Sequence, residues 1–390
     1  MKRLLKLFAF VLFTAPHAWA AQEGVAAQSV TAQDAVERTR TLYESAQKYE
    51  AAGDWRAAQG VWEEVLKLAP ADARAWVNLG VALNRQDKTE EAIGAWTRAA
   101  AADPRLAGAP FNIGLALVRK GEHAAAIPHL RRALALDPKA EGARRALAIA
   151  LLGAERYQEA SREIAQLLAR APRDAALLEL AARSFMQQRR FAEALSVLRR
   201  RLDLEGSTGE MWALYGDALD GVSRTPEAAA AYERAVELAP DSNITRYGLG
   251  YLYWKLYRYD DAERVLSEVL RRDPKDARAA FTLGDLHLTR GDAARAVPLL
   301  EQAARAYPSE FDTRFALGRA LAQTADLARA AEELREAVKV NDKIADGHFQ
   351  LGRLLLRLGH KEEAASEFER AKQLHDEKRA GEALRTPPKP

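Results

Sequence analysis

The sequence predicts an all-α protein made of about ten helix-turn-helix repeats of 34 residues each. The first observation is a ladder of small residues spaced 34 apart, with alanine in place of glycine at three steps: Ala46, Gly80, Gly114, Ala148, Ala182, Gly216, Gly250, Gly284, Gly318 and Gly352. The second is an alanine twelve residues after each of these, from Ala58 to Ala364, without one insertion or deletion. The third is a composition rich in helix formers and poor in the β-branched residues that favour strands.

The first twenty residues are predicted to be a secretory signal peptide. Lys2, Arg3 and Lys6 form a basic start, an apolar stretch runs to about residue 15, and Ala18-Trp19-Ala20 supplies a cleavage pattern of small residues. We expect cleavage after Ala20. The apolar stretch is too short for a membrane anchor, so we expect no stable membrane insertion after cleavage. Residues 21–38 then form a polar leader.

Charge and cysteine content exclude several function classes. The formal net charge of +3 equals the three basic residues of the segment 1–20, which has no acidic residue, so the rest of the chain is neutral. A neutral chain has no bulk attraction to nucleic acid or to an anionic membrane. The chain has no cysteine, which excludes disulfides, thiolate metal sites and catalytic thiols.

The repeats, over residues 39–378, each comprise two amphipathic helices of about 14 residues. The small residue in each helix lets the two backbones approach closely, because a larger side chain there would overpack at a cost of about 1–3 kcal/mol. Prolines end most repeats: Pro70, Pro104, Pro138, Pro172, Pro240, Pro274 and Pro308. Turn glycines are expected to be left-handed between paired helices: Gly53, Gly121, Gly291 and Gly359.

The fifth repeat departs from this pattern because Gly206 stands where the proline is expected. The stretch around it is the least helical of the array. Two interpretations remain open, a hinge near residues 206–209 or a variant turn. At the other end, residues 379–390 are polar and end in prolines, which predicts a disordered tail.

The repeat resembles the tetratricopeptide repeat family, most closely in "AWVNLGVALNRQDKTEEAIGAWTRAAAADP" (75–104) and "FTLGDLHLTRGDAARAVPLLEQAARAYP" (281–308). The resemblance covers almost the whole chain after the signal peptide. It implies a right-handed α-solenoid in which the first helices line a concave groove. It also implies a scaffold that binds protein or peptide segments, without naming the partner.

The stretch "YGLGYLYWKLYRYDDA" (247–262) concentrates aromatic residues in a chain that is 7% aromatic. The 34-residue spacing places Tyr253 and Tyr259 at packing positions. Tyr247, Tyr251 and Trp254 instead follow an i, i+4, i+7 spacing, which puts them on one helical stripe. By resemblance to the family, that stripe faces the groove.

Further groove residues follow from the same spacing. Tyr247, Phe281, Phe315 and Phe349 form a ladder of rings, flanked by Lys255, Asp285, Arg319 and Arg353. Aromatic rings bordered by arginines are typical of a peptide-binding surface. Two alternatives stay open: the rings stack on sugars, or the phenylalanines only pack between helices. Asn78 and Asn112 repeat at the same spacing and could hold a partner's backbone, although the basic residues of a carboxylate clamp are missing beside them.

No arrangement of residues typical of catalysis is present. The sequence has no phosphate-binding loop and no H-E-x-x-H or G-x-S-x-G motif, and its histidines are scattered. We therefore expect no enzyme activity, no metal and no cofactor. The sequence predicts an exported, periplasmic interaction scaffold that organises an envelope assembly or a secretion complex. The alternative is a carbohydrate-binding or exopolysaccharide-export module.

Overall fold

The computed structural model describes residues 32–385, with side chains described from 35 to 380. Every regular element in that range is an α-helix, which confirms the predicted all-α class. Two compact parts divide within helix α5, between Ala116 and Leu117. The predicted signal peptide, residues 21–31 of the leader and residues 386–390 of the tail lie outside the described residues.

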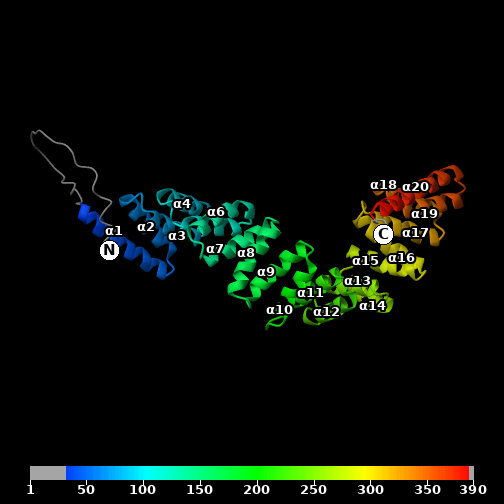
Figure 1. Cartoon of the computed structure of the whole chain (residues 1–390), viewed down its shortest axis with the longest axis horizontal. Helices are drawn as coiled ribbons and strands as arrows, with labels where there is room; N and C mark the ends of the chain where they lie inside the picture. Colours follow the sequence, from blue (N-terminus) through cyan, green and yellow to red (C-terminus); the bar gives the residue numbers. More distant parts are fainter. Residues whose placement is uncertain (1–31, 386–390) are drawn as a thin grey trace, which may run out of the picture. The chain divides into compact units, whose positions relative to one another are not determined.

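Twenty helices make up the described residues (Figure 1). Their bounds are α1 Ala32–Ala51, α2 Trp55–Leu68, α3 Ala73–Asn84, α4 Thr89–Ala102, α5 Gly108–Arg119, α6 His123–Leu136, α7 Glu141–Gly153, α8 Tyr157–Arg170, α9 Ala175–Gln187, α10 Phe191–Leu202, α11 Gly209–Gly221, α12 Thr225–Leu238, α13 Asn243–Lys255, α14 Tyr259–Arg272, α15 Ala277–Thr289, α16 Ala293–Ala306, α17 Phe311–Gln323, α18 Leu327–Val340, α19 Ala345–Leu358 and α20 Lys361–Arg385. Odd-numbered helices are the first helices of the ten repeats and even-numbered helices are the second.

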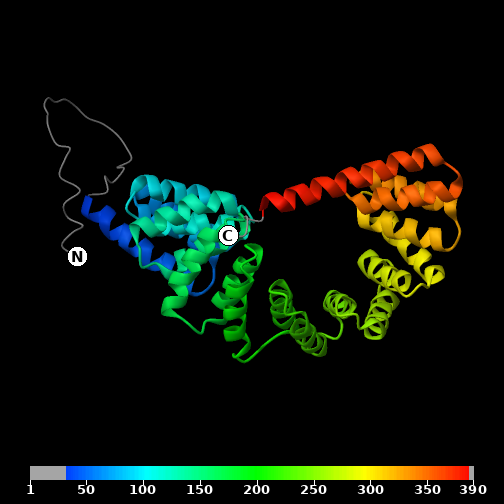
Figure 2. The ribbon, with the colours of Figure 1, turned by 45° about the vertical axis from the view of Figure 1, so that its right-hand side comes forward.

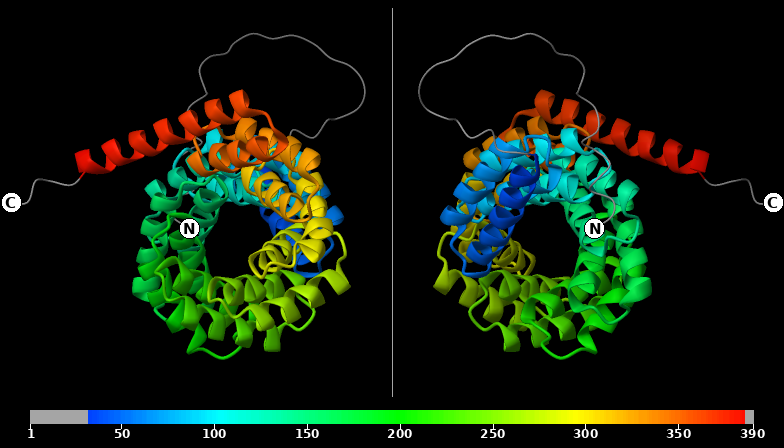
Figure 3. Two further views of the ribbon diagram at one scale, coloured as in Figure 1. Left: turned by 90° about the vertical axis from the view of Figure 1, so that its right-hand side faces the viewer. Right: turned by 90° about the vertical axis from the view of Figure 1, so that its left-hand side faces the viewer.

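Within residues 117–385, each second helix packs against the first helix of the next repeat, so the repeats follow one another along a curve (Figure 3). First helices of successive repeats also touch directly, from α11 and α13 to α17 and α19. No contact of that extent joins two second helices of the described chain. The first helices therefore lie on the inner side of the curve.

The small residues of the ladder explain how closely the two helices of a repeat approach. A Cβ added at Gly80 would lie 2.3 Å from the indole of Trp96, and one at Gly284 would lie 2.8 Å from Leu300. The partner stands sixteen residues later in each case. The same position holds several of the largest fully buried side chains: Trp62, Ile164, Leu198, Leu266 and Leu300. The predicted close approach is confirmed.

A left-handed residue closes the turn between the two helices of every repeat. The four predicted turn glycines have φ between +74° and +86°. In the other six repeats a residue with a side chain takes the same place: Asp87, Glu155, Arg189, Ser223, Tyr257 and Ala325, with φ between 56° and 63°. The 34-residue period of these positions shows that helix pairing imposes the turn, because six sequences that disfavour it still adopt it.

The ends of the array differ from the predicted boundaries. Helix α1 begins at Ala32, so the last residues of the leader are helical. Helix α20 continues past Lys378 to Arg385, so the structure differs from the predicted disordered tail over residues 379–385 (Figure 2). Near the predicted hinge, Gly206 is left-handed, and its carbonyl accepts a 3.2 Å hydrogen bond from buried Arg201. The hinge itself stays a prediction.

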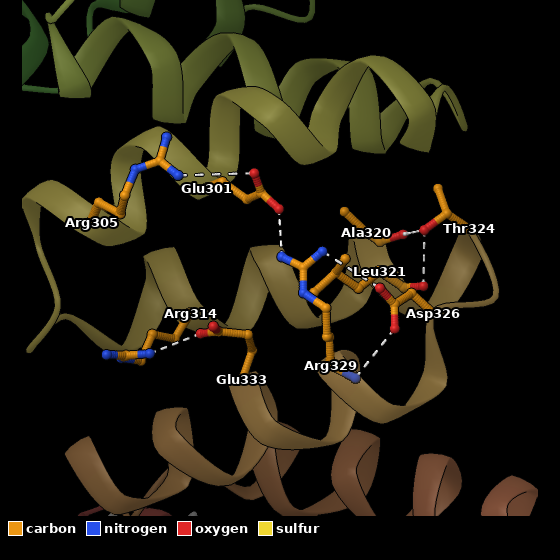
Figure 4. Close-up of polar contacts among 9 residues, drawn as sticks. All are labelled: Glu301, Arg305, Arg314, Ala320, Leu321, Thr324, Asp326, Arg329 and Glu333. Carbon is orange, nitrogen blue, oxygen red and sulfur yellow. Dashed lines mark hydrogen bonds and ion pairs between the residues drawn. The ribbon is translucent and has the colours of Figure 1, made fainter.

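Charged side chains on the second helices pair with one another. Arg329 of α18 contacts Glu301 of α16 in the preceding repeat, and Arg305 lies 4.0 Å from the same carboxylate (Figure 4). A further pair, partly buried, joins the two helices of one repeat: Arg314 of α17 lies 2.8 Å from Glu333 of α18. Each exposed pair of this kind stabilises by at most about 1 kcal/mol.

We expect Gly80→Ala to destabilise the protein by about 1–3 kcal/mol, because the new Cβ overlaps the buried Trp96 indole. Gly94→Ala is the matched control in the same repeat. No atom lies within 4 Å of its Cβ position, so it should stabilise by about 0.5–1 kcal/mol. Urea unfolding midpoints measure both changes. Equal midpoints for the two variants would contradict the role of the small residue.

We expect Ala325→Gly to stabilise the protein by about 1 kcal/mol, because glycine adopts the left-handed turn without the steric cost of a Cβ. Gly359→Ala is the converse change at the same place in the next repeat, and it should destabilise by a similar amount. No other atom approaches the Gly359 Cβ position, so the cost would be conformational. Differential scanning calorimetry compares the two, and shifts of the same sign would refute this explanation.

Candidate functional site

Three aromatic rings form a stacked column along α13. Tyr247 and Tyr251 have ring centroids 6.3 Å apart with planes inclined by 28°, and Tyr251 and Trp254 are 5.6 Å apart at 25°. Tyr251 in the middle is 37% exposed, whereas the rings at the two ends are half-buried. The predicted stripe therefore exists as one continuous aromatic surface on a first helix.

Two of the other aromatic residues of this stretch, Tyr253 and Tyr259, pack in the core. Tyr253 is buried in the core, where its hydroxyl donates a 2.8 Å hydrogen bond to Glu233. Burial and that carboxylate raise the pKa of Tyr253 to about 12. Tyr259 opens α14 half-buried against the same core, as predicted. Tyr257 is exposed and occupies the left-handed turn.

Helix α15 borders both ends of the column. The Arg278 guanidinium lies over the Tyr247 ring, 4.7 Å from its centroid. At the other end, Trp254 lies close to the carboxyl of Asp285 and favours its charged form. Burial raises the pKa of Asp285, while the Arg319 charge and Trp254 oppose this effect. The aromatic column thus continues into a carboxylate that is partly removed from water.

Lys255, which was predicted to flank the ladder of rings, forms an ion pair with a neighbouring first helix. Its ammonium forms 2.7 Å contacts with both carboxylate oxygens of Asp220 on α11. It also lies 5.9 Å from the centroid of the Tyr251 ring. Lys255 therefore joins two successive first helices, and a partner would have to compete with Asp220 to reach it.

The ladder of phenylalanines has mixed environments. Phe281 and Phe315 are half-buried and pack against the core of repeats 8–10. The packing interpretation is thus supported for these two rings. Phe349 is 45% exposed because no further repeat follows it among the described residues.

Two arginines on neighbouring first helices have no ion-pair partner among the described residues. Arg319 lies 5.7 Å from the centroid of Phe315, and Arg353 lies 6.0 Å from that of Phe349. Both are exposed. Arginines of the second helices, in contrast, mostly have carboxylate partners, as Arg329 does (Figure 4). We call Tyr247, Tyr251, Trp254, Asp285, Arg319 and Arg353 the aromatic–arginine surface.

The predicted asparagine pair lies in the other part of the chain. Asn78 on α3 and Asn112 on α5 are half-buried, and neither side chain hydrogen-bonds another described residue. Their amides are therefore available to a ligand. Because it belongs to a different compact part from the aromatic column, this pair is a separate candidate site.

Two acidic residues on α11 were not singled out from the sequence as site residues. Asp217 and Asp220 occupy the repeat positions that Tyr251 and Trp254 occupy on α13. The Tyr232 hydroxyl donates a 2.6 Å hydrogen bond to Asp217, and burial raises the pKa of that carboxyl. The 34-residue spacing could have identified both aspartates, because it places them at the same helical positions as Tyr251 and Trp254, on the inner side of α11.

Among the described residues, neither a metal-binding cluster nor a membrane-spanning helix was found. His287 is buried in the interior, with 2% of its surface exposed, and burial lowers its pKa. No cluster of three or more potential metal ligands occurs among residues 32–385. In that same range, no helix is both long enough and apolar enough to cross a bilayer.

Paired helices in register, with a variable inner surface, define an α-helical repeat scaffold. Tetratricopeptide repeat models match residues 43–107, 86–141, 179–243, 215–263, 247–311 and 315–379, and a second model of the same description matches 117–184. These matches cover most of the chain, which therefore belongs to the tetratricopeptide repeat family. The family consists of scaffolds that bind other proteins and are typically non-catalytic.

Individual relatives are distant. The general transcriptional corepressor trfA of Dictyostelium discoideum is 31% identical over 88 residues, which is 22% of this chain and 6% of that protein. The chain thus spans a small fraction of the curated relative that it matches. MamA from Desulfovibrio magneticus RS-1 is 21% identical over 45% of this chain and 98% of its own, with a TM-score of 0.42. A chain in the crystal structure of the APC/C hetero-tetramer Cut9–Hcn1 is 13% identical over 86% of this chain and 73% of its own, with a TM-score of 0.47.

We expect Asp285→Asn to raise the thermal unfolding midpoint at neutral pH. The amide removes a charge that burial disfavours and keeps an acceptor oxygen of the same shape beside Trp254. Because the native pKa is raised, the native state holds the proton more tightly than the unfolded chain does. The cost of the charge is therefore fully present above the native pKa and disappears as pH falls below the ordinary value of 3.8.

The difference between Asp285→Asn and the unaltered protein should consequently narrow on acidification. Asp241→Asn is the matched control, since its side chain is fully exposed, and should not shift the midpoint. Thermal unfolding followed by circular dichroism across a pH series measures all three proteins. Lower stability of Asp285→Asn at neutral pH would show that the carboxylate contributes to folding.

Proposed function

We propose that the aromatic–arginine surface binds a protein segment that carries carboxylates beside apolar side chains. The observation that carries this proposal is the pair of exposed arginines on α17 and α19, which have no ion-pair partner among the described residues and lie on first helices of the same part as the stacked rings of α13. Arginine binds carboxylates through two parallel hydrogen bonds, and desolvated aromatic rings supply most of the energy in peptide interfaces. In this proposal Arg319 and Arg353 hold the acidic groups, and Tyr251 contacts the apolar ones.

The proposed role is a non-catalytic scaffold that joins partners through this segment. Membership of a family of interaction scaffolds supports it. We propose further, from the pattern of residues 1–20, that the chain is exported and cleaved after Ala20. It would then act in the periplasm and organise an envelope or secretion complex. Its neutral charge after residue 20 favours protein over nucleic acid as the partner.

Carbohydrate is the second candidate ligand, because stacked rings also bind sugars. Two observations favour a peptide. The cations of Arg278 and Lys255 already lie over the rings of Tyr247 and Tyr251, which leaves less of each ring face for a sugar. Unpaired arginines match an acidic peptide better than a neutral glycan.

Selection of a random peptide library on the purified chain, with an oligosaccharide array in parallel, tests the proposal. We expect enriched peptides that contain Asp or Glu. Tyr251→Ala and Arg319→Glu should each weaken their binding by about tenfold, or ~1.4 kcal/mol. Binding should also weaken as salt is raised. The matched controls are Tyr49→Ala, at an exposed tyrosine of α1, and Arg305→Glu, at an exposed arginine of α16.

Peptide binding that none of these substitutions changes would place the site elsewhere. Binding of an oligosaccharide that depends on Tyr251, without any enriched peptide, would replace the proposal with the carbohydrate function. Fluorescence anisotropy gives the affinities. Circular dichroism of each variant excludes unfolding as the cause of a loss.

A further inference from the structure

The second helix of the tenth repeat has an open face. Each earlier second helix of the C-terminal part, from α6 to α18, packs against the first helix of the next repeat. Among the described residues no helix follows α20, which runs far past its partner α19 (Figure 2). The position that a first helix would fill is therefore open beside α20.

A cavity of about 1020 Å³ lies at this position. Its apolar lining comes from the residues around the start of α19 and from α20, and consists of Ile344, Ala345, Phe349, Phe368, Ala371 and Leu374. Phe349 and Phe368 touch with ring centroids 5.7 Å apart. Phe349 is 45% exposed, whereas Phe281 and Phe315, at the same repeat position, are half-buried. We call this cavity the end groove.

Basic side chains surround the apolar floor of the end groove. Lys343 comes from the loop before α19, and Lys372, His375 and Lys378 come from α20. No ion pair to a described residue engages Lys343 or Lys372. The one carboxylate in the lining, Asp346, already accepts a 3.3 Å hydrogen bond from Gln350. The groove is therefore apolar at its floor and positively charged at its rim.

Lys372 differs in polarity from the residues at the same position of the other repeats. The other nine repeats place an apolar residue at its position: Leu66, Ala100, Leu134, Leu168, Leu202, Val236, Leu270, Ala304 and Val338. In the preceding repeat Val338 meets the next first helix, since it lies 3.2 Å from the Cβ position of Gly347. Lys372 thus stands where an incoming helix would make contact. A lysine there also keeps an open end soluble, but that role explains neither Lys343 across the groove nor the exposed Phe349.

We propose that the end groove binds an amphipathic helix of a partner protein, with a stripe of apolar side chains flanked by Asp or Glu. The geometry of every earlier repeat makes a helix the matching occupant, because each second helix of the C-terminal part is covered by one. The apolar floor accepts the stripe, and the basic rim pairs with the acidic flanks. This site is separate from the aromatic–arginine surface.

Two synthetic helical peptides test the proposal on the full chain. Both have the length of α19, 14 residues, and the same leucine stripe, but one has glutamate flanks and the other lysine flanks. Fluorescence anisotropy should show the acidic peptide binding about tenfold more tightly than the basic one, with an affinity that falls as salt rises.

Lys372→Glu should weaken the acidic peptide by about tenfold and strengthen the basic one. The control Lys339→Glu, at an exposed lysine of α18, should leave both affinities unchanged. Circular dichroism checks that each variant folds.

Three results would overturn the proposal. They are equal affinity for the two peptides, no binding of the acidic peptide at millimolar concentration, or acidic-peptide binding that Lys372→Glu leaves unchanged. A fourth such result would come from sedimentation of the chain alone. Self-association that Lys372→Glu abolishes would mean that a second copy occupies the groove instead.

Discussion

The whole array depends on one contact, in which a glycine or alanine of the first helix meets a large side chain sixteen residues later. Gly80 against Trp96 and Gly216 against Tyr232 leave no room for a Cβ. Because interiors are close-packed, this contact sets the distance between the helices of a repeat. It also sets their register, so the turn and the repeat length cannot vary. The unbroken 34-residue period and the ten left-handed turns follow from it.

This constraint separates positions that must pack from positions that are free to carry function. The inner side of a first helix lies away from the contact, and so its residues differ from repeat to repeat. Asp217, Tyr251, Asp285, Arg319 and Arg353 share one such position in successive repeats. Acidic, aromatic and basic side chains thus occupy the same position in successive repeats, while the packing of the helices stays the same. The energetic cost of the raised pKa at Asp285 fits a surface selected for binding rather than for stability.

The sequence was sufficient to predict the fold because the period appears in every repeat and each mark has one physical meaning. It also assigned Tyr253 to the core and Tyr251 to an exposed stripe. What it could not predict are contacts between repeats. The Lys255 pair with Asp220 depends on how two first helices meet, which the period within one repeat does not contain. The burial of Phe315 likewise depends on the repeat that follows it. The helical end of α20 was not predicted, because polar composition alone does not distinguish an exposed helix from a disordered tail.

Hydrogen–deuterium exchange of the chain, with and without a peptide selected on it, tests the central claim most directly. That claim is that binding occurs on the inner side of first helices in the C-terminal part. The account predicts slower exchange in segments of α13, α15 and α17, with α14, α16 and α18 unchanged. Slower exchange confined to the second helices, or to α20 alone, would contradict it.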